Sequence, residues 1–189
     1  YASEHSTRVA FEPFAKVVAG QPIKIMPTGL WHRGDRKLDI SPARLSEVVA
    51  NFKRGLPRFR IGINLDHRED GGKVGDLKDL AYLKDGPKGE GLYATDYELT
   101  PKGIKAIEED GYDAVSAEVV WSLNGGARYQ DPETGDLHDN VITGLALTPR
   151  PFFGHREVAI FTADDTTGVR PQEAQMDEKF VEQLAAKQG

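Results

Sequence analysis

Residues 113–121 read DAVSAEVVW, and this stretch decides what kind of fold the chain can form. Successive side chains of a β-strand point to opposite faces of its sheet, so every second residue here faces the same way. One face is wholly apolar and consists of Val115, Ala117, Val119 and Trp121. We expect that face to lie against the core. The opposite face carries Ser116 and Glu118, which are about 7 Å apart along a strand. The stretch therefore predicts a strand with a hydroxyl and a carboxylate on its outer side.

A second alternating stretch, FRIGINLDH, covers residues 59–67. Its apolar positions share one face with the final histidine; they are Phe59, Ile61, Ile63, Leu65 and His67. The pattern predicts a strand with its apolar face inward. His67 ends this strand beside Asp66, just before a polar loop. A side chain at a strand end is held firmly and still reaches solvent, so His67 is a candidate functional residue.

Cap and turn signals organise the rest of the chain. Ser41 before Pro42, and Thr100 before Pro101, are N-cap and first-turn signals that predict two helices. Further strands are expected over 22–31, 77–84, 91–98, 141–148 and 158–162. The result is about seven strands and two helices, a mixed α/β fold rich in β-structure. The order is not a regular alternation of strand and helix, which argues against a doubly wound parallel sheet.

Composition excludes several classes of function. The 189 residues contain 24 Lys and Arg against 30 Asp and Glu, a net charge of −6, and they contain no Cys. An acidic chain is a poor nucleic-acid binder, because phosphate neutralisation needs a basic surface. The lack of cysteine excludes disulfides, thiolate zinc sites and a cysteine nucleophile. No run of 18 apolar residues is present, so we expect no membrane-spanning helix.

Ser116 and His67 are the residues that could carry chemistry. A serine hydroxyl becomes a useful nucleophile only beside a general base, which His67 could supply. The residues alone leave two plainer interpretations open. Ser116 can be a small polar residue on an outer sheet face, and His67 can bond a backbone carbonyl at its strand end.

Acidic residues around His67 raise the question of a metal. Asp66, Glu69 and Asp70 make this loop rich in oxygen ligands. However, no second histidine stands at helical or hairpin spacing, and such loops are usually solvated. We therefore expect no metal and no cofactor.

Five segments occur in an order that resembles a known family. They are NLDH (64–67), VGDLKDLAY (74–82), GLYATDYELTPKGIKAI (91–107), AVSAEVVW (114–121) and VITGLALTPRPFF (141–153). Together they resemble the phage Mu-type protease/scaffold proteins, a branch of the tailed-phage prohead (capsid maturation) serine proteases related to herpesvirus assemblins. The resemblance covers residues 20–162. It implies a serine endopeptidase with a mostly antiparallel β-barrel surrounded by helices.

The resemblance also implies roles for individual residues. The histidine of the DH strand end matches His67 and is the base; the serine after the TPKG helix matches Ser116 and is the nucleophile. Related proteases have an acid on the next strand, but residues 141–148 contain none. The residue nearest to the position of that acid is Thr143, and Asp139 lies just before the strand. We favour Glu118 as the third catalytic residue, because it shares a face with Ser116; a Ser–His dyad is the alternative.

In the family that the chain resembles, the oxyanion donors lie in the turn after the strand that corresponds to residues 141–148. Here it reads Thr148-Pro149-Arg150-Pro151. The two prolines leave few N–H groups, so we expect Arg150 to contribute through its own N–H or through a held water.

The resemblance implies a domain order and a biological setting. Residues 1–162 would form the protease domain, 163–176 a linker and 177–189 the start of a helical scaffolding region, with Met176 an internal start for scaffold alone. The expected substrates and assembly partners are the chain itself, scaffold and capsid protein, inside the procapsid in the bacterial host cytoplasm. A homo-oligomer is expected as well. The alternative is a non-catalytic capsid assembly or scaffolding module.

Overall fold

The computed structural model describes residues 21–68, 70–121 and 128–160, and the structural statements below concern these residues. The linker predicted over 163–176, the helix predicted over 177–189 and Met176 lie outside them. The strands are β1 (Ile23–Pro27), β2 (Gly29–Arg33), β3 (Arg36–Ile40), β4 (Gly62–Leu65), β5 (Gly75–Leu83), β6 (Gly91–Leu99), β7 (Ala114–Val120), β8 (Tyr129–Gln130), β9 (Leu137–His138) and β10 (Val141–Thr148). The helices are α1 (Pro42–Lys53), α2 (Pro101–Glu108) and α3 (His155–Val158).

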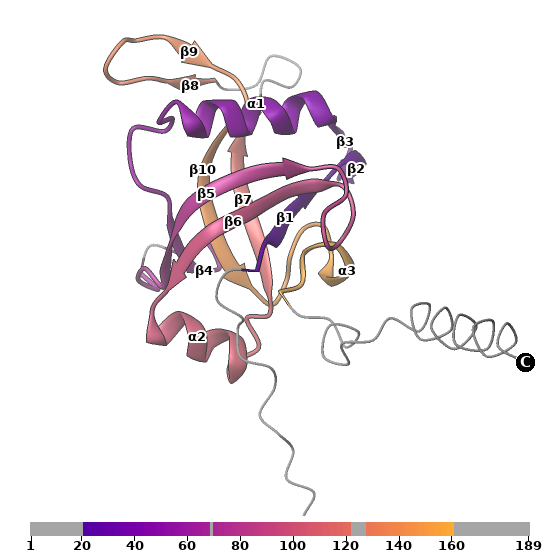
Figure 1. Ribbon diagram of the computed structural model, residues 1–189, viewed down its shortest axis with the longest axis vertical. Helices are drawn as coiled ribbons and strands as arrows, with labels where there is room; N and C mark the ends of the chain where they lie inside the picture. The colour runs from indigo at the N-terminus through magenta and orange to yellow at the C-terminus, as the bar shows by residue number, and fades with distance from the viewer. Residues whose placement is uncertain (1–20, 69, 122–127, 161–189) are drawn as a thin grey trace, which may run out of the picture. The chain divides into compact units, whose positions relative to one another are not determined.

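Six strands form one sheet that curves into a nearly closed barrel (Figure 1). Their order is β1-β6-β5-β4-β10-β7. This confirms a mixed α/β fold rich in β-structure. The expectation of a mostly antiparallel barrel needs correction, because the sheet is mixed: β10 runs parallel to β4 on one side and antiparallel to β7 on the other. Alternation along a strand predicts its faces but not its neighbours or their direction, so the sequence pattern could not show this pairing.

The two predicted helices are present, and each begins at its predicted cap. The hydroxyl of Ser41 accepts a hydrogen bond from the N–H of Arg44, and that of Thr100 accepts one from Gly103. Pro42 and Pro101 occupy the first helical positions. In Figure 1, α1 lies across one end of the barrel and α2 lies at the other end.

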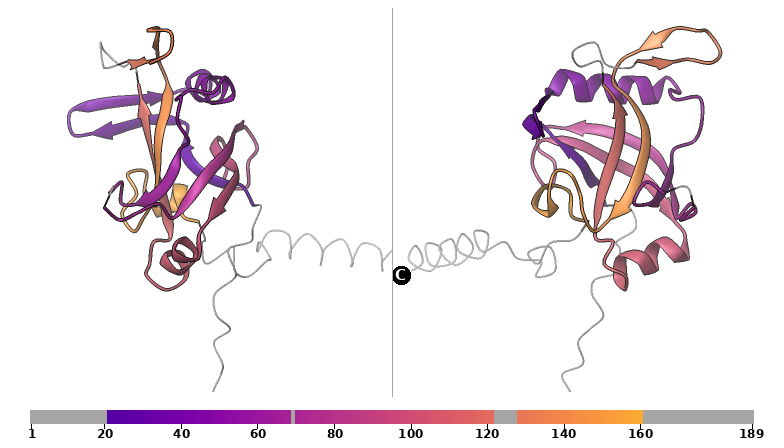
Figure 2. Two further views of the ribbon diagram at one scale, coloured as in Figure 1. Left: turned by 90° about the vertical axis from the view of Figure 1, so that its left-hand side faces the viewer. Right: turned by 180° about the vertical axis from the view of Figure 1, so that it is seen from behind.

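Two hairpins were not expected from the sequence. Strands β2 and β3 pair only with each other, as do β8 and β9. Figure 2, in its left-hand view, shows the β2–β3 hairpin projecting away from the barrel. The strand expected over 158–162 is also wrong in its described part, because α3 continues to Val158 and only an isolated bridge joins Ala159 to Ala114.

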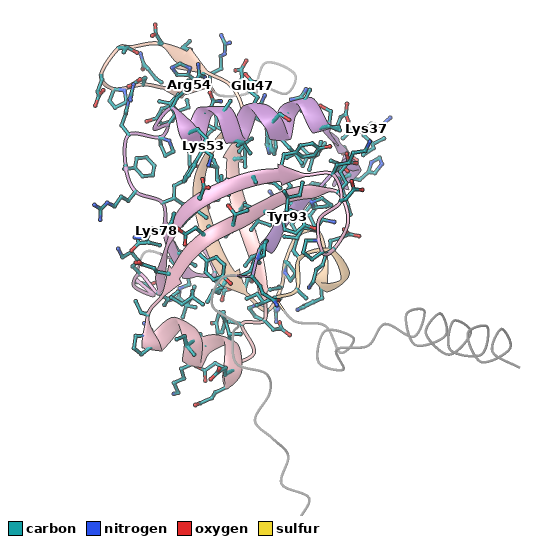
Figure 3. All side chains as sticks on the ribbon, viewed as in Figure 1. Lys37, Glu47, Lys53, Arg54, Lys78 and Tyr93 are labelled. Atoms are coloured by element: carbon teal, nitrogen blue, oxygen red, sulfur yellow. The ribbon has the colours of Figure 1, made fainter. Side chains whose placement is uncertain are left out.

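The core lies inside the barrel and under α1. Its largest fully buried side chains include Tyr93, Ile25, Met26, Ile40, Leu45, Leu80, Leu92, Ile142 and Leu147. Tyr93, which projects from β6 (Figure 3), is completely buried. Its hydroxyl donates to the carbonyl of Gly89 at 2.6 Å and accepts from the N–H of Lys88 at 3.0 Å. These bonds satisfy the hydroxyl of this completely buried ring.

Candidate active site

A tight turn at the end of β4 sets the position of His67. The strand ends at Leu65, and Asp66 and His67 both have left-handed backbone, with φ of 52° and 56°. The N–H of Arg68 closes the turn by donating to the carbonyl of Leu65 at 2.9 Å. Two consecutive positive φ values between paired residues define a type I′ turn, which usually contains Asn and Gly. Asp and His are therefore held here at a conformational cost.

This turn corrects the strand predicted over 59–67. Phe59 is not in the core but 55% exposed, and the strand itself begins only at Gly62. Ile63 is buried as expected. His67 does not share its face, because the left-handed turn ends the alternation and directs the imidazole toward the outer side of the sheet.

His67 and Glu118 meet on that outer side. Nδ1 of His67 lies 3.2 Å from Oε1 of Glu118. The His67 side chain is 25% exposed and the Glu118 side chain is 54% exposed. The two residues come from strands that are not neighbours, since β10 lies between β4 and β7. The Glu118 side chain must therefore reach across β10 to meet the histidine.

Gly144 makes that reach possible. It is the partner of Glu118 in the β7–β10 ladder. A Cβ at position 144 would lie 2.7 Å from Oε2 of Glu118, closer than real Cβ atoms come to other heavy atoms. Gly144 was not among the predicted site residues. Its place inside a strand is a usable signal, however, because a glycine there often marks the close approach of another group.

Ser116 lies on the same outer face of the sheet. It pairs with Ala146 of β10, which in turn pairs with Asn64 of β4. Glu118, two residues along the same face of β7, is 54% exposed, which identifies this face as the outer one. Ser116 is half-buried, and within the described part of the chain its hydroxyl makes no hydrogen bond. Figure 2, in its right-hand view, shows β7 and β10 side by side from behind.

The pairing register puts the ladder position of Ser116 between the positions from which His67 and Glu118 extend. His67 follows the ladder position of Leu65, whereas Glu118 lies at the position of Gly144. The position of Ser116 and Ala146 falls between these two along β10. A histidine that contacts Glu118 from the end of β4 must therefore extend over the ladder position that contains Ser116.

This arrangement suits nucleophilic catalysis by a serine. The carboxylate faces Nδ1, which is the nitrogen that an orienting acid contacts in a Ser-His-acid triad. Nε2 is then the ring nitrogen available to take a proton. The hydroxyl of Ser116 is uncommitted, and it lies on the same face as both partners.

The other residues considered for the third role are engaged elsewhere. Asp139 pairs with Arg128, whose Nε and Nη2 donate at 2.6 and 3.0 Å. Thr143 donates through its hydroxyl to the backbone carbonyl of Glu118 at a long 3.5 Å. Neither is placed against His67 by a described contact. Of the three, Glu118 is the residue that the structure brings to the imidazole.

Local contacts engage two further groups near the candidate site. The N–H of Arg150 donates to the hydroxyl of Thr148 at 3.1 Å, so it is already used within the turn and is not free for an oxyanion. Asp70 pairs with the guanidinium of Arg68 at 2.7 Å, and this contact lowers the pKa of the Asp70 carboxyl below its ordinary value. Asp70 is therefore turned toward a cation within its own loop and not toward His67.

Comparison of the chain with protein-family models, with curated proteins and with solved structures found no match. Among the helices of the described residues, none has the length and apolar character that crossing a membrane requires.

Proposed function

We propose that the chain is a serine endopeptidase of capsid maturation, in which Ser116 is the nucleophile, His67 the general base and Glu118 the acid that orients the base. The observation that carries the catalytic part is the contact of Nδ1 of His67 with Oε1 of Glu118 over the ladder position of Ser116. The order of sequence motifs supplies the capsid-maturation part.

In the proposed reaction, the hydroxyl oxygen of Ser116 attacks the carbonyl carbon of a peptide bond. Its proton passes to Nε2 of His67, and the imidazolium that forms is stabilised by Glu118. The proton then goes to the leaving amine, and water releases the acyl group from Ser116 by the same route. Ser116 is half-buried and the His67 side chain is 25% exposed, so an extended peptide would bind on the outer face of the sheet.

The proposed substrates are the chain itself, scaffold and capsid protein, gathered inside a procapsid. Confinement raises the effective concentration of a cleavage site, so modest intrinsic activity suffices there. Assembly or self-association of the protease would serve the same purpose. We therefore propose that activity is highest under conditions in which copies of the chain are concentrated.

The experiment follows the intact mass of the full-length chain with time, at high concentration and with scaffold and capsid protein. The wild type is compared with Ser116→Ala, and Ser46→Ala, on the exposed side of α1, serves as a serine control. We expect shortened products in the wild type and control but not in Ser116→Ala. A fluorophosphonate should label Ser116 alone.

A non-catalytic assembly module predicts a different result. The wild type and Ser116→Ala would then remain equally intact under every assembly condition, and the fluorophosphonate would label neither. That pair of results would reject the endopeptidase and leave the barrel as a structural part of a capsid.

A further inference from the structure

A hollow lies between β5, the end of α1 and the chain that enters β4; we call it the α1–β5 hollow. The carbonyl of Ile61 accepts a hydrogen bond from the N–H of Leu77 on β5 at 3.0 Å, but residues 57–59 are irregular and pair with no described strand. β5 itself continues to Leu83. The hollow has a volume of about 380 Å³, within the range of pockets that bind ligands, and none of the proposed catalytic residues lines it.

The wall of the α1–β5 hollow is mainly apolar. Its apolar side chains come from α1, from the chain between α1 and β4, and from β5; they are Phe52, Leu56, Pro57, Phe59, Ile61 and Leu77. Leu56, Ile61 and Leu77 are buried, whereas Phe59 is 55% exposed and its ring is available to a partner. A wall of this kind favours a ligand with a large apolar side chain, because burying apolar surface is the main source of affinity in such pockets.

The charged residues that line the hollow leave one charge uncompensated. Nζ of Lys73 donates to both oxygens of Asp76 at 3.0 and 2.9 Å, and Lys78 pairs with Glu98 at 3.1 Å. Arg60 is exposed and pairs with no carboxylate among the described residues. The complementary group on a ligand is therefore an anion, and a carboxylate fits a guanidinium with two parallel hydrogen bonds.

The backbone beside the hollow favours an extended peptide over a small acid. Phe59 and Arg60 are exposed, and their N–H and carbonyl groups make no hydrogen bond to a described residue. Unpaired backbone groups on the surface can pair with an incoming extended chain, as in recognition by strand addition. A peptide can supply these backbone bonds together with the apolar side chain and the carboxylate.

We propose that the α1–β5 hollow binds a segment of an acidic polypeptide, with one large apolar side chain in the hollow and a neighbouring carboxylate on Arg60. The proposal goes beyond the endopeptidase function and does not depend on it, because no residue of the hollow takes part in the proposed reaction. A nucleic acid fits less well, since the net charge of −6 opposes the binding of phosphates.

The test measures binding of a fluorescein-labelled peptide, EEDFEE, to the full-length chain by fluorescence anisotropy. The peptide EEDGEE lacks the apolar side chain, and KKNFKK carries the opposite charge. We expect saturable binding of EEDFEE, and binding of the other two peptides that is weaker by about 10-fold or more.

Arg60→Glu should weaken the binding of EEDFEE about 10-fold, because it replaces an attraction by a repulsion. The matched control is Arg44→Glu in α1, which changes the net charge equally at another arginine without a described carboxylate partner. That control should bind EEDFEE as the wild type does. Arg60 is exposed and unpaired, so both the wild type and Arg60→Glu should unfold at the same temperature. Amide chemical shifts should change on binding in residues 52–61 and 76–78.

Several results would overturn the proposal. They are the absence of saturable EEDFEE binding, equal affinities of the wild type and Arg60→Glu, and shift changes that miss residues 52–61. Displacement of EEDFEE by a single-stranded oligonucleotide would assign the hollow to nucleic acid instead. Self-association of the chain that Arg60→Glu abolishes would assign it to a second copy.

The two proposals fail separately. Ser116→Ala should bind EEDFEE as tightly as the wild type. Absence of fluorophosphonate labelling in a wild type that binds EEDFEE would reject the endopeptidase alone. Self-processing in a wild type that does not bind EEDFEE would reject the peptide site alone.

Discussion

The carboxylate of Glu118 occupies the space that a side chain at position 144 would need, so Gly144 is a precondition for the contact between Glu118 and His67. An added methyl group would force the carboxylate away from β10, because the ladder fixes both backbones. The proposed third catalytic residue therefore depends on a glycine of the neighbouring strand. The proposed catalytic geometry involves three strands and not a single motif.

Gly144→Ala should slow self-processing about 10²-fold, the usual consequence of misplacing a catalytic group by roughly 1 Å. The matched control is Gly62→Ala on β4, where a Cβ would meet mainly the flexible chain of Lys73 at 3.0 Å. That control should retain wild-type rates. The measurement is intact mass with time for both variants. Equal rates in Gly144→Ala and the wild type would show that Glu118 does not need its present position.

His67 should be replaceable by glycine with a gain in stability. Its φ of 56° is strained for any residue with a side chain, and glycine adopts it freely. His67→Ala keeps the strain and removes the imidazole, so the difference between His67→Gly and His67→Ala isolates the backbone effect. We expect His67→Gly to exceed His67→Ala by about 1 kcal/mol in the free energy of unfolding, measured in urea. Both variants should be inactive.

If the two variants proved equally stable, the turn would not store strain. If His67→Gly is the more stable, the chain maintains a costly histidine at a position where glycine fits better. Such a conflict between local preference and the residue present is typical of functional sites.

The sequence predicted the elements of this fold better than their connections. The alternation over 113–121 correctly placed Ser116 and Glu118 on the face opposite the buried Val115. Caps and prolines correctly predicted both long helices. These signals are local, since they depend on neighbours within a few residues.

What the sequence could not predict depends on contacts between distant residues. The prediction that His67 shares a face with Ile63 was wrong, because the turn that contains His67 lacks the Asn-Gly signature of type I′ turns. The contact of Glu118 with His67 spans 51 positions along the chain, from 67 to 118, and it passes over Gly144. The periodicity of a single strand contains no information about such a contact.

Acid should weaken the attachment of the β8–β9 hairpin. Asp131 is buried and accepts hydrogen bonds from Nε and Nη2 of Arg58, the shorter at 2.7 Å. The Arg58 guanidinium lowers the pKa of Asp131 from 3.8 to about 2. A lowered folded-state pKa gives stability that is fully present above pH 3.8 and is lost as the pH falls toward 2.

Asp131→Asn removes this dependence. The variant should be less stable than the wild type at neutral pH, and the difference should shrink as the pH falls from 4 to 2. Urea unfolding at several pH values measures it, and the other carboxyl groups, common to both proteins, cancel in the comparison. A difference that stays constant over this range would mean that Asp131 is not stabilised as an anion.

An ion pair between a buried lysine and a partly exposed glutamate joins α3 to the barrel. Lys24 belongs to β1, and its side chain is 4% exposed. Its Nζ lies 2.9 Å from Oε2 of Glu157 in α3. It also donates to the carbonyl of Lys88 at 2.8 Å. Glu157→Gln would leave the buried lysine charge without a counterion. Because Glu157 is 30% exposed, we expect a loss of about 2 kcal/mol in the free energy of unfolding, below the range for fully buried pairs.

The double variant Lys24→Met, Glu157→Gln should recover most of that loss. Replacing a buried pair by an apolar side chain removes the desolvation cost together with the attraction, and the net change is often small. Recovery would show that the cost in Glu157→Gln came from an unpaired buried charge. No recovery would mean that the pair holds α3 in place through its geometry, and α3 should then lose protection from amide hydrogen exchange before the barrel does.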